Sequence, residues 1–163
     1  MKHPIGTIVS LMVDHERGVP ERVHHFLKVY AFSKVIGESE GLDEREQEII
    51  QIAALMHDIG IRPSLAKYGS SAGVYQEQEG PALARTKLNE LGYDSQLIER
   101  VCFLIAHHHT YGEQRDRDLQ ILIEADFLVN ALEEKMSREA IERARERIFR
   151  TARGTAYLQA MFL

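Results

Sequence analysis

The sequence predicts an all-α protein, a helical bundle with a metal site in its core. Apolar residues recur at three- and four-residue spacing over nearly the whole chain, which is the period of an amphipathic helix. No segment alternates apolar and polar residues for long enough to argue for a sheet. Several histidines and aspartates fall on the apolar side of the expected helices, where such groups are normally paired or bound to a metal. The 163 residues suffice for one domain with a substantial core.

The composition is that of an ordinary globular protein, with 44% hydrophobic and 28% charged residues. The net charge of −5 argues against a binder of nucleic-acid polymers, which would carry a basic surplus. Cys102 is the single cysteine, which excludes an internal disulfide and suits a reducing compartment; we expect it to be a small buried hydrophobe. Because the sequence shows neither a secretory signal nor an apolar run of about 20 residues, we expect a cytoplasmic protein without membrane contact.

Two helices are expected before residue 42. The first covers residues 5–15, and the chain stops being helical at Gly18. Pro20 suits the first turn of the second helix, where a backbone N–H would have no helical partner in any case. This second helix runs to about residue 40 and ends at Gly41, because glycine readily adopts the conformation that follows a helix end.

The next helix carries the most informative residues of the chain, His57 and Asp58. Asp43 is a good N-cap for this helix, and Glu46 follows three residues later, as in a capping box. The apolar run over residues 49–56 leads directly into His57 and Asp58. An aspartate beside an imidazole at the end of so apolar a helix indicates a polar site inside the protein.

A loop and a helix are expected in the middle of the chain. Gly60 and Pro63 interrupt the helical pattern, and the Gly- and Ser-rich stretch after them predicts a loop over residues 64–74. A helix over residues 75–91 follows and ends at Gly92.

The next expected helix ends in three consecutive histidines. Asp94 or Ser95 caps this helix, since both residue types accept hydrogen bonds from the first free N–H groups. The helix finishes at the run His107-His108-His109, and residues 111–117 form a polar connection.

Three helices are expected in the remaining chain. Asp118 opens the first, which runs to about residue 134, and Ser137 caps the second, which runs to residue 149. A short apolar helix closes the chain. Residues 135–153 mix Glu and Arg at helical spacing, which is typical of a solvated helix face with weak ion pairs rather than a nucleic-acid patch.

Three of these helices turn a polar side chain toward the core. Helical neighbours lie three and four residues apart, so that an apolar stripe identifies the buried face. A lone histidine on such a stripe is usually a satisfied core residue, but several helices with inward His and Asp build metal sites in bundles. The stripes are Val29, Phe32 and Ile36 for His25; Leu119, Leu122 and Val129 for Asp126; and Leu97, Val101 and Leu104 for His108.

The neighbours of these inward histidines are expected to point elsewhere. Adjacent residues on a helix diverge by about 100°, so His24 cannot share the direction of His25. In the histidine run, His108 has the best apolar stripe and His107 the next best. His109 is expected to face the loop.

His25, His57, Asp58 and Asp126 form the expected metal shell. Two imidazoles and two carboxylates without a thiolate suit Mn, Fe, Co, Ni, Zn or Mg better than Cu(I) or a structural zinc. Around a six-coordinate ion, four protein ligands would leave two positions for a water and a substrate oxygen. A metal in such a site lowers the pKa of its water and polarises a phosphoryl group.

These residues resemble the pattern of the HD-domain superfamily of metal-dependent phosphohydrolases. The order is H…HD…D, carried by residues 25–29 (HFLKV), 53–60 (AALMHDIG) and 124–126 (EAD), and it spans most of the chain. Residues 79–84, residues 91–93 and the histidine run add to the similarity.

The resemblance implies an all-α fold with a divalent metal ion in the helical core. It implies that His25, His57, Asp58 and Asp126 are the metal ligands, and that Asp58 bridges or orients the metal-bound water. The activity it implies is the hydrolysis of phosphate esters, often of nucleotides.

Two features depart from the family pattern. Many members carry a lysine directly after the HDIG block, where it can meet phosphate, but Ile61 stands at that position here. Arg62 or Lys67 is the candidate for this contact.

The second departure concerns a second metal ion. Members with two metals carry a histidine shortly before the downstream glycine, and Gln76 holds that place in this chain. A second ion would depend on His107, His108 or Glu79.

The sequence thus predicts a metal-dependent phosphohydrolase, either a phosphomonoesterase or a phosphodiesterase, that cleaves a small phosphorylated substrate such as a nucleotide. Asp58 and His108 are the expected catalytic residues, His108 as a phosphate contact or a general acid. The alternative is a catalytically silent regulatory module that binds a metal or a nucleotide.

We expect one HD-type domain over residues 1–163, with its motif-bearing core over 20–134 and charged helices over 137–163. Assembly into a homo-oligomer is left open.

Overall fold

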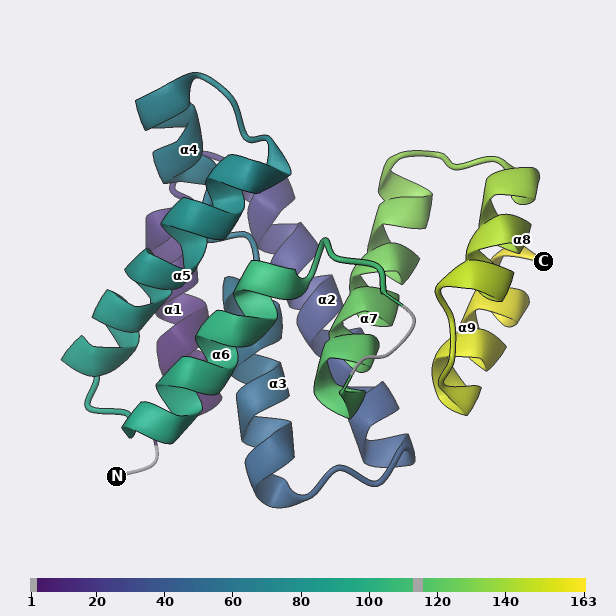
Figure 1. The fold of residues 1–163 in the computed structure, drawn as a ribbon, viewed down its shortest axis with the longest axis horizontal. Coiled ribbons are helices and arrows are strands. Elements are labelled where there is room, and N and C mark those ends of the chain that lie inside the picture. The colour runs from purple at the N-terminus through teal and green to yellow at the C-terminus, as the bar shows by residue number, and fades with distance from the viewer. Residues whose placement is uncertain (1–2, 113–115) are drawn as a thin grey trace.

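The protein is all-helical, as the sequence predicts. The structure is a computed structural model that describes residues 3–112 and 116–163, and no strand occurs in these residues. The helices in chain order are α1 (Ile5–His15), α2 (Pro20–Ser39), α3 (Glu44–Met56), α4 (Ile61–Tyr68), α5 (Gly73–Glu90), α6 (Ser95–His107), α7 (Arg117–Glu133), α8 (Arg138–Arg147) and α9 (Ala152–Phe162) (Figure 1).

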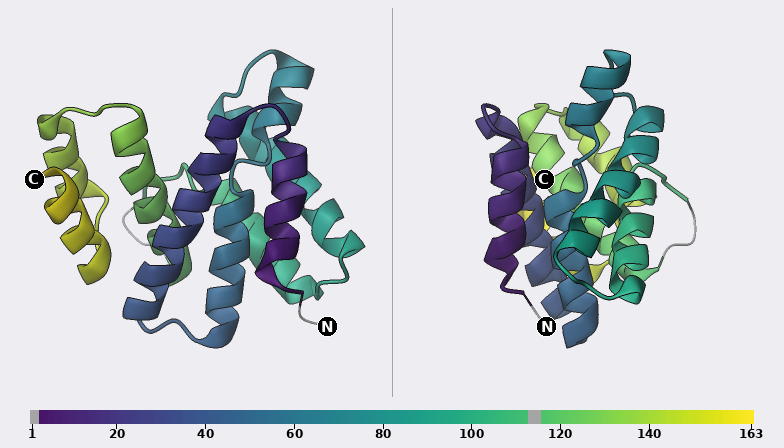
Figure 2. Two further views of the ribbon diagram at one scale, coloured as in Figure 1. Left: turned by 180° about the vertical axis from the view of Figure 1, so that it is seen from behind. Right: turned by 90° about the vertical axis from the view of Figure 1, so that its left-hand side faces the viewer.

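Helix α7 lies inside the bundle, and every residue from Leu119 to Val129 is buried. A helix that is buried all round must be covered by neighbours on several sides. Helix α2 packs along α7 and also against α3, while α5 pairs with α6 and both α1 and α6 contact α3. The hairpin of α8 and α9 stands at the opposite end of the molecule from α1 and α5 (Figures 1 and 2).

The starts of α3 and α6 confirm the predicted caps. Asp43 Oδ1 accepts the backbone N–H of Glu46 at 2.8 Å, and Glu46 Oε2 accepts the N–H of Asp43 at 2.8 Å, which completes the capping box. At α6 the cap is Asp94, whose Oδ1 accepts the N–H of Leu97 at 3.0 Å. The guanidinium of Arg45 also donates to both oxygens of Asp94. One carboxylate therefore fixes the start of α6 and ties it to α3.

The prediction of a loop over residues 64–74 is wrong in its first half. Ile61–Tyr68 forms α4, and α5 already begins at Gly73. Pro63 does not prevent a helix because it is the third residue of α4, where its missing N–H has no helical partner to lose. Gly69 ends α4 with φ 66°, a conformation that glycine adopts without strain. Of the predicted connection over 111–117, residues 113–115 lie outside the described part.

The C-terminal hairpin is attached to α7 by one buried carboxylate, that of Glu124. Its Oε2 accepts the backbone N–H groups of Arg150 and Thr151, each at 3.1 Å, and its Oε1 accepts the Thr151 hydroxyl at 2.7 Å. Gln120, one turn earlier in α7, donates to Glu124 and to the Ile148 carbonyl. These bonds lie at the turn between α8 and α9 and hold the hairpin against α7.

Cys102 is 3% exposed, which confirms the expected small buried hydrophobe. Its burial also raises the pKa of the thiol. Among the described residues, no helix combines the length and the apolarity needed to cross a bilayer.

Gly60 allows the turn after α3 to lie directly against α5. A Cβ at residue 60 would stand 2.9 Å from the Gly80 nitrogen and 3.0 Å from the Gln76 carbonyl oxygen. Both contacts are with backbone atoms, so no side-chain rotation relieves them. Gly80 is itself close to α6, since a Cβ there would stand 3.1 Å from Ile105 Cγ2. The turn that carries His57 and Asp58 is thus fixed by close backbone packing.

We expect Gly60→Ala to lower the free energy of unfolding by roughly 1–3 kcal/mol, because the added methyl group forces the two backbones apart. Gly6→Ala is the matched control, since nothing lies within 4 Å of its Cβ position in α1. Gly6 is the second residue of α1, so we expect this change to alter the free energy of unfolding by less than about 0.5 kcal/mol. Urea unfolding of the three proteins measures both effects. A Gly60→Ala protein as stable as the wild type would contradict the close packing.

Candidate metal centre

Four helices bring polar side chains to one place in the core. His57 is the C-cap residue of α3, with Asp58 next to it, and His108 is the C-cap residue of α6. His25 comes from the second turn of α2 and Asp126 from the middle of α7. The side chains of His57 and His108 are almost fully buried, whereas that of Asp58 remains 21% exposed. Asp58 is therefore the member of this cluster best placed to meet a molecule from solution.

The atoms that could bind a metal converge within the cluster. The Nε2 atoms of His25 and His57 are 3.2 Å apart. Asp126 Oδ1 lies 3.1 Å from His25 Nε2 and 3.3 Å from His57 Nε2. Asp58 Oδ2 lies 3.4 Å and 3.2 Å from the same two nitrogens. The other oxygen of Asp58 lies 3.5 Å from His108 Nε2, so this carboxylate reaches both sides of the cluster.

The second nitrogen of each of the three imidazoles is bound to an acceptor. His57 Nδ1 donates to the Ala54 carbonyl at 2.7 Å, and His108 Nδ1 donates to the Ile105 carbonyl at 2.7 Å. His25 Nδ1 donates to Glu133 Oε2 at 2.9 Å. Each neutral ring therefore carries its proton on Nδ1 and turns the Nε2 lone pair toward the centre. This is the arrangement that orients metal-binding histidines.

The two carboxylates of the cluster favour a positive charge between them. Burial works against protonation of His57, but Asp58 and Asp126 outweigh it and hold the pKa of His57 well above its ordinary value. The pKa of His25 is also raised: burial would lower it, but Asp126 and Asp58 outweigh the burial. Burial would raise the pKa of Asp58, yet His57 and His108 lower it well below its usual range. The pKa of Asp126 is lowered by His25 and His57 in spite of its burial.

These residues fit a divalent cation. His108 Nε2 is buried without a hydrogen-bond partner, which is costly unless something else binds its lone pair. Imidazole nitrogens and carboxylate oxygens suit Mn, Fe, Co, Ni, Zn or Mg. Three groups of residues have ligand atoms within 4.8 Å of one another: His25, His57 and Asp58; His57, His108 and Asp126; and Asp58, His108 and His109.

His109 is exposed, as a residue facing the loop would be, but it also has a contact that the sequence analysis did not predict. Its ring lies against that of His108, with 3.8 Å between the ring centroids, and it joins Asp58 and His108 in the third group. His107 is in none of the three groups; its Nδ1 donates to the Phe103 carbonyl and its ring stacks on Phe103. The histidine run thus contributes its second and third members, because the helix ends at His107 and the next residues follow a turn.

Three other candidates from the sequence are not brought into the cluster. Glu79 is in none of the groups and instead accepts from Lys67 Nζ and the Tyr68 hydroxyl, each at 2.9 Å. Arg62 donates to the Arg17 carbonyl at 2.8 Å and lies 3.9 Å from Glu16. A phosphate contact by Arg62 or Lys67 stays a prediction.

Two residues that support the cluster were missed by the sequence analysis. Glu133 lies seven residues after Asp126 in α7, and this two-turn spacing places it on the same helix face. The signal was therefore available in the sequence. His15 Nε2 lies 3.0 Å from the Ile59 carbonyl and so supports the turn that follows His57 and Asp58. No local pattern indicates that contact, since it joins residues 44 positions apart.

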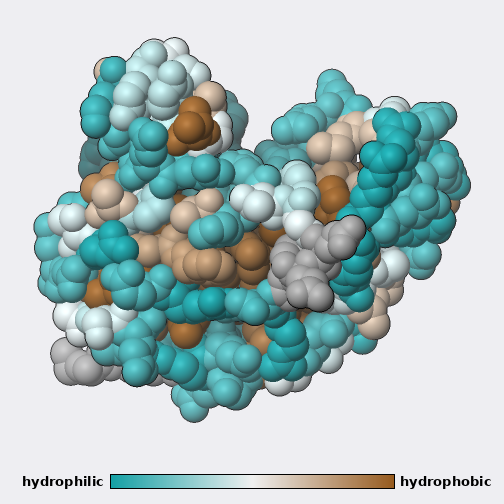
Figure 3. All heavy atoms as spheres, in the orientation of Figure 1, coloured by the Kyte–Doolittle hydropathy of each residue, from teal (hydrophilic) through white to brown (hydrophobic). Residues whose placement is uncertain are grey.

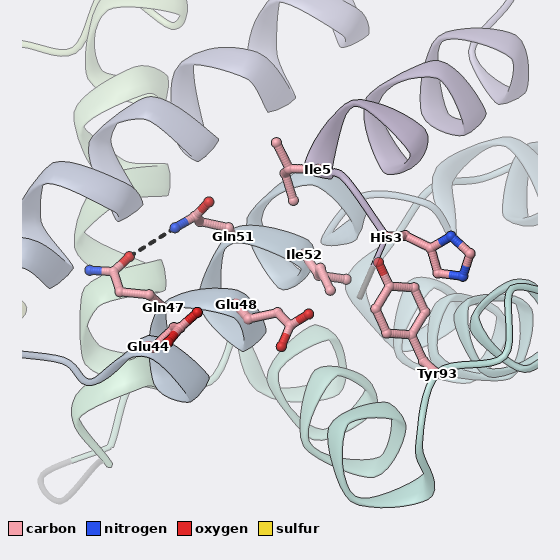
Figure 4. A pocket seen from close by; sticks show the side chains of 8 residues that line it. All are labelled: His3, Ile5, Glu44, Gln47, Glu48, Gln51, Ile52 and Tyr93. Atoms are coloured by element: carbon pink, nitrogen blue, oxygen red, sulfur yellow. Dashed lines mark hydrogen bonds between the residues drawn. The ribbon is translucent and has the colours of Figure 1, made fainter. Parts of the chain in front are cut away.

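A cavity of about 150 Å³ lies at the other end of α3. Helix α3 lines it from Glu44 to Ile52, together with His3 and Tyr93 (Figure 4). None of the cluster residues lines this cavity.

Comparison with known proteins identifies the family. A crystal structure of a predicted HD superfamily hydrolase from an uncultured Thermotogales bacterium has the same fold, with a TM-score of 0.68. The two chains are 24% identical over 94% of this chain and 82% of the other. No functionally curated protein matches the chain. The sequence pattern of the HD domain matches residues 22–131, which contain every residue of the three groups. The chain therefore belongs to the HD domain family.

Proposed function

We propose that the protein is a metal-dependent phosphohydrolase that cleaves a small phosphorylated substrate. The observation that carries this proposal is the buried cluster in which the Nε2 atoms of three imidazoles lie within 3.5 Å of a carboxylate oxygen of Asp58 or Asp126. A divalent ion held there supplies Lewis acidity, which acidifies water and polarises a phosphoryl oxygen. Membership of the HD family and the hydrolase name of the structural relative support the same reaction class.

The proposed ligands are His25, His57, Asp58 and Asp126. His57 and Asp126 are buried at the end of α3 and within α7, which suits them to hold an ion inside the protein. Asp58 is more exposed and has oxygens on two sides, which suits it to orient a water molecule toward substrate. We assign Asp58 this catalytic role.

His108 is the proposed second catalytic residue. Its Nε2 is buried without a hydrogen-bond partner, and this atom is where the residue would take up or give a proton. An imidazole N–H can donate a hydrogen bond to phosphate or give a proton to a leaving group as a general acid. Binding of a second ion by His108 with Asp58 and His109 is the competing role for the same atom.

We further propose a nucleotide as the substrate and the cytoplasm as the site of action. The overall charge of −5 and the mixed-charge C-terminal helices support a small substrate rather than a nucleic-acid polymer. We propose that residues 1–163 act as one unit, because Glu124 ties the C-terminal hairpin to the helix that carries Asp126.

The test is turnover by the full chain on nucleoside monophosphates, dinucleotides and aryl phosphates. We expect activity on at least one class with one of Mn, Fe, Co, Ni, Zn or Mg, loss of that activity with a chelator, and recovery when the ion is returned. Whether monoesters or diesters react separates a phosphomonoesterase from a phosphodiesterase. A protein that binds metal but is silent on every ester with every ion would favour the regulatory alternative.

A further inference from the structure

A cavity of about 530 Å³ lies beside α7 and α8, outside the metal centre. Its apolar wall is made by Phe127 of α7, Met136 and the α8 face of Ala140 and Ala144. Figure 3 shows apolar surface in the hollow between α7 and α8, bordered by hydrophilic residues. Its volume falls in the range of small-molecule sites, roughly 300–1,000 Å³.

Three arginines, Arg143, Arg147 and Arg150, line the same cavity. Arg143 and Arg147 are one turn apart on α8, and both are exposed. Arg150 donates to the carbonyls of Glu146, Arg147 and Phe149 at the end of α8. Within the described residues, none of the three guanidinium groups forms an ion pair with a carboxylate.

The gathering of three arginines without acidic partners at one cavity distinguishes this part of the described structure. The net charge is negative, and most other arginines of the described residues are paired, for example Arg45 with Asp94, Arg85 with Glu99, Arg100 with Asp116 and Asp118, and Arg117 with Glu46. Arg145 and Arg153 are the exceptions outside the cavity. On α8 itself, Glu142 pairs with Arg138 and not with Arg143. The cavity therefore combines an apolar wall with three guanidinium groups that form no ion pair with a carboxylate of residues 3–112 or 116–163.

We infer that this cavity binds a small organic anion, a phosphate or carboxylate attached to an apolar or aromatic body. The guanidinium groups would bind the anionic end, since their fork of N–H donors matches the oxygens of phosphate and carboxylate. The apolar wall would bury the body, with Phe127 available for aromatic contact. The anionic end of the ligand would thus contact the arginines, and its apolar body would contact the apolar wall.

The inference does not depend on hydrolysis at the metal centre. None of the residues that line the cavity belongs to the three metal-binding groups. Asp126 and Phe127 are neighbours in α7 but diverge by about 100° around the helix, so one faces the metal centre and the other the cavity. Failure of the proposed function would leave this binding site untouched, and the reverse also holds.

Titration of the full chain with anilinonaphthalene sulfonate, an aromatic anion whose fluorescence rises in apolar sites, tests the inference. We expect one site per chain, unchanged when a chelator removes metal. Phenyl phosphate should displace the probe, whereas inorganic phosphate and phenol should not at equal concentration, because each offers only half of the ligand.

Arg147→Glu should weaken binding of the probe at least tenfold, and Arg143→Glu should act in the same direction. Arg145→Glu is the matched control, because it makes the same charge change in the last turn of α8 at a residue outside the cavity. Urea unfolding ensures that the three variants are compared as folded proteins. Absence of binding, equal loss in Arg145→Glu and Arg147→Glu, or displacement by inorganic phosphate alone would overturn the inference.

Discussion

Asp58→Ala is expected to lower kcat/KM for phosphate esters by at least about 10³-fold, and to reduce the metal content of the purified protein. The reason is the position of this carboxylate. Its Oδ2 faces the Nε2 atoms of His25 and His57, and its Oδ1 faces that of His108, so its removal affects both sides of the cluster. Steady-state turnover together with elemental analysis measures the two effects. Asp58→Asn keeps the shape of the side chain and should lose activity as well.

Glu79→Ala is the matched control for Asp58→Ala. The sequence marks Glu79 as a possible ligand, but the structure pairs it with Lys67 and Tyr68 at a partly exposed site. We expect turnover within a few-fold of wild type and a stability loss of less than about 1 kcal/mol. Full activity in Asp58→Ala would contradict the proposed catalytic role of the Asp58 carboxylate. A loss in Glu79→Ala equal to that in Asp58→Ala would show that the cluster extends further than the geometry indicates.

Glu124→Ala is expected to lower the free energy of unfolding by about 3–5 kcal/mol, the largest stability effect of any single change considered. The substitution leaves the N–H groups of Arg150 and Thr151 and the Thr151 hydroxyl without their acceptor inside the protein. It also leaves a hole beside Gly154, whose backbone approaches the carboxylate so closely that a Cβ there would collide with it. Urea unfolding followed by circular dichroism measures the loss.

Two further variants serve as comparisons for Glu124→Ala. Glu124→Gln keeps one oxygen acceptor and should lose clearly less stability than Glu124→Ala. Glu142→Ala removes an exposed carboxylate from the same hairpin, where its pair with Arg138 is worth less than about 1 kcal/mol. If Glu124→Ala unfolds at the same urea concentration as Glu142→Ala, the buried carboxylate does not hold the hairpin in place.

The sequence predicts the helices well where capping chemistry and periodicity agree. Asp43 with Glu46 places the start of α3, and the apolar run behind them carries the helix to His57. The loop prediction fails at residues 64–68, where α4 forms, because the local sequence signals conflict with the packing of this segment. Gly60 and Pro63 usually interrupt helices, yet here the first permits close contact with α5 and the second occupies the first turn of α4.

The predictions for the metal centre likewise hold where the helix pattern decides the position of a residue and fail where contacts between segments decide it. His25, His108 and Asp126 are buried, as their apolar stripes predict, since the apolar face of a helix is the face that packs on its neighbours. Once a helix ends, the stripe no longer applies, so it could not predict the contact between the rings of His109 and His108. The partners of Lys67 and Glu79 depend on how α4 folds onto α5, a contact between two segments that no local pattern specifies.

The C-cap positions of His57 and His108 have an electrostatic consequence. A helix presents its unpaired carbonyl groups at its C-terminal end, which carries about half a negative charge. Helices α3 and α6 both end at the cluster, where the rings of His57 and His108 lie 5.1 Å apart. Two helix ends and two carboxylates make a strongly negative potential at this point. A phosphate ester would be repelled by it until the charge is neutralised, so occupancy should follow a fixed order, with the cation first and the anionic substrate after it.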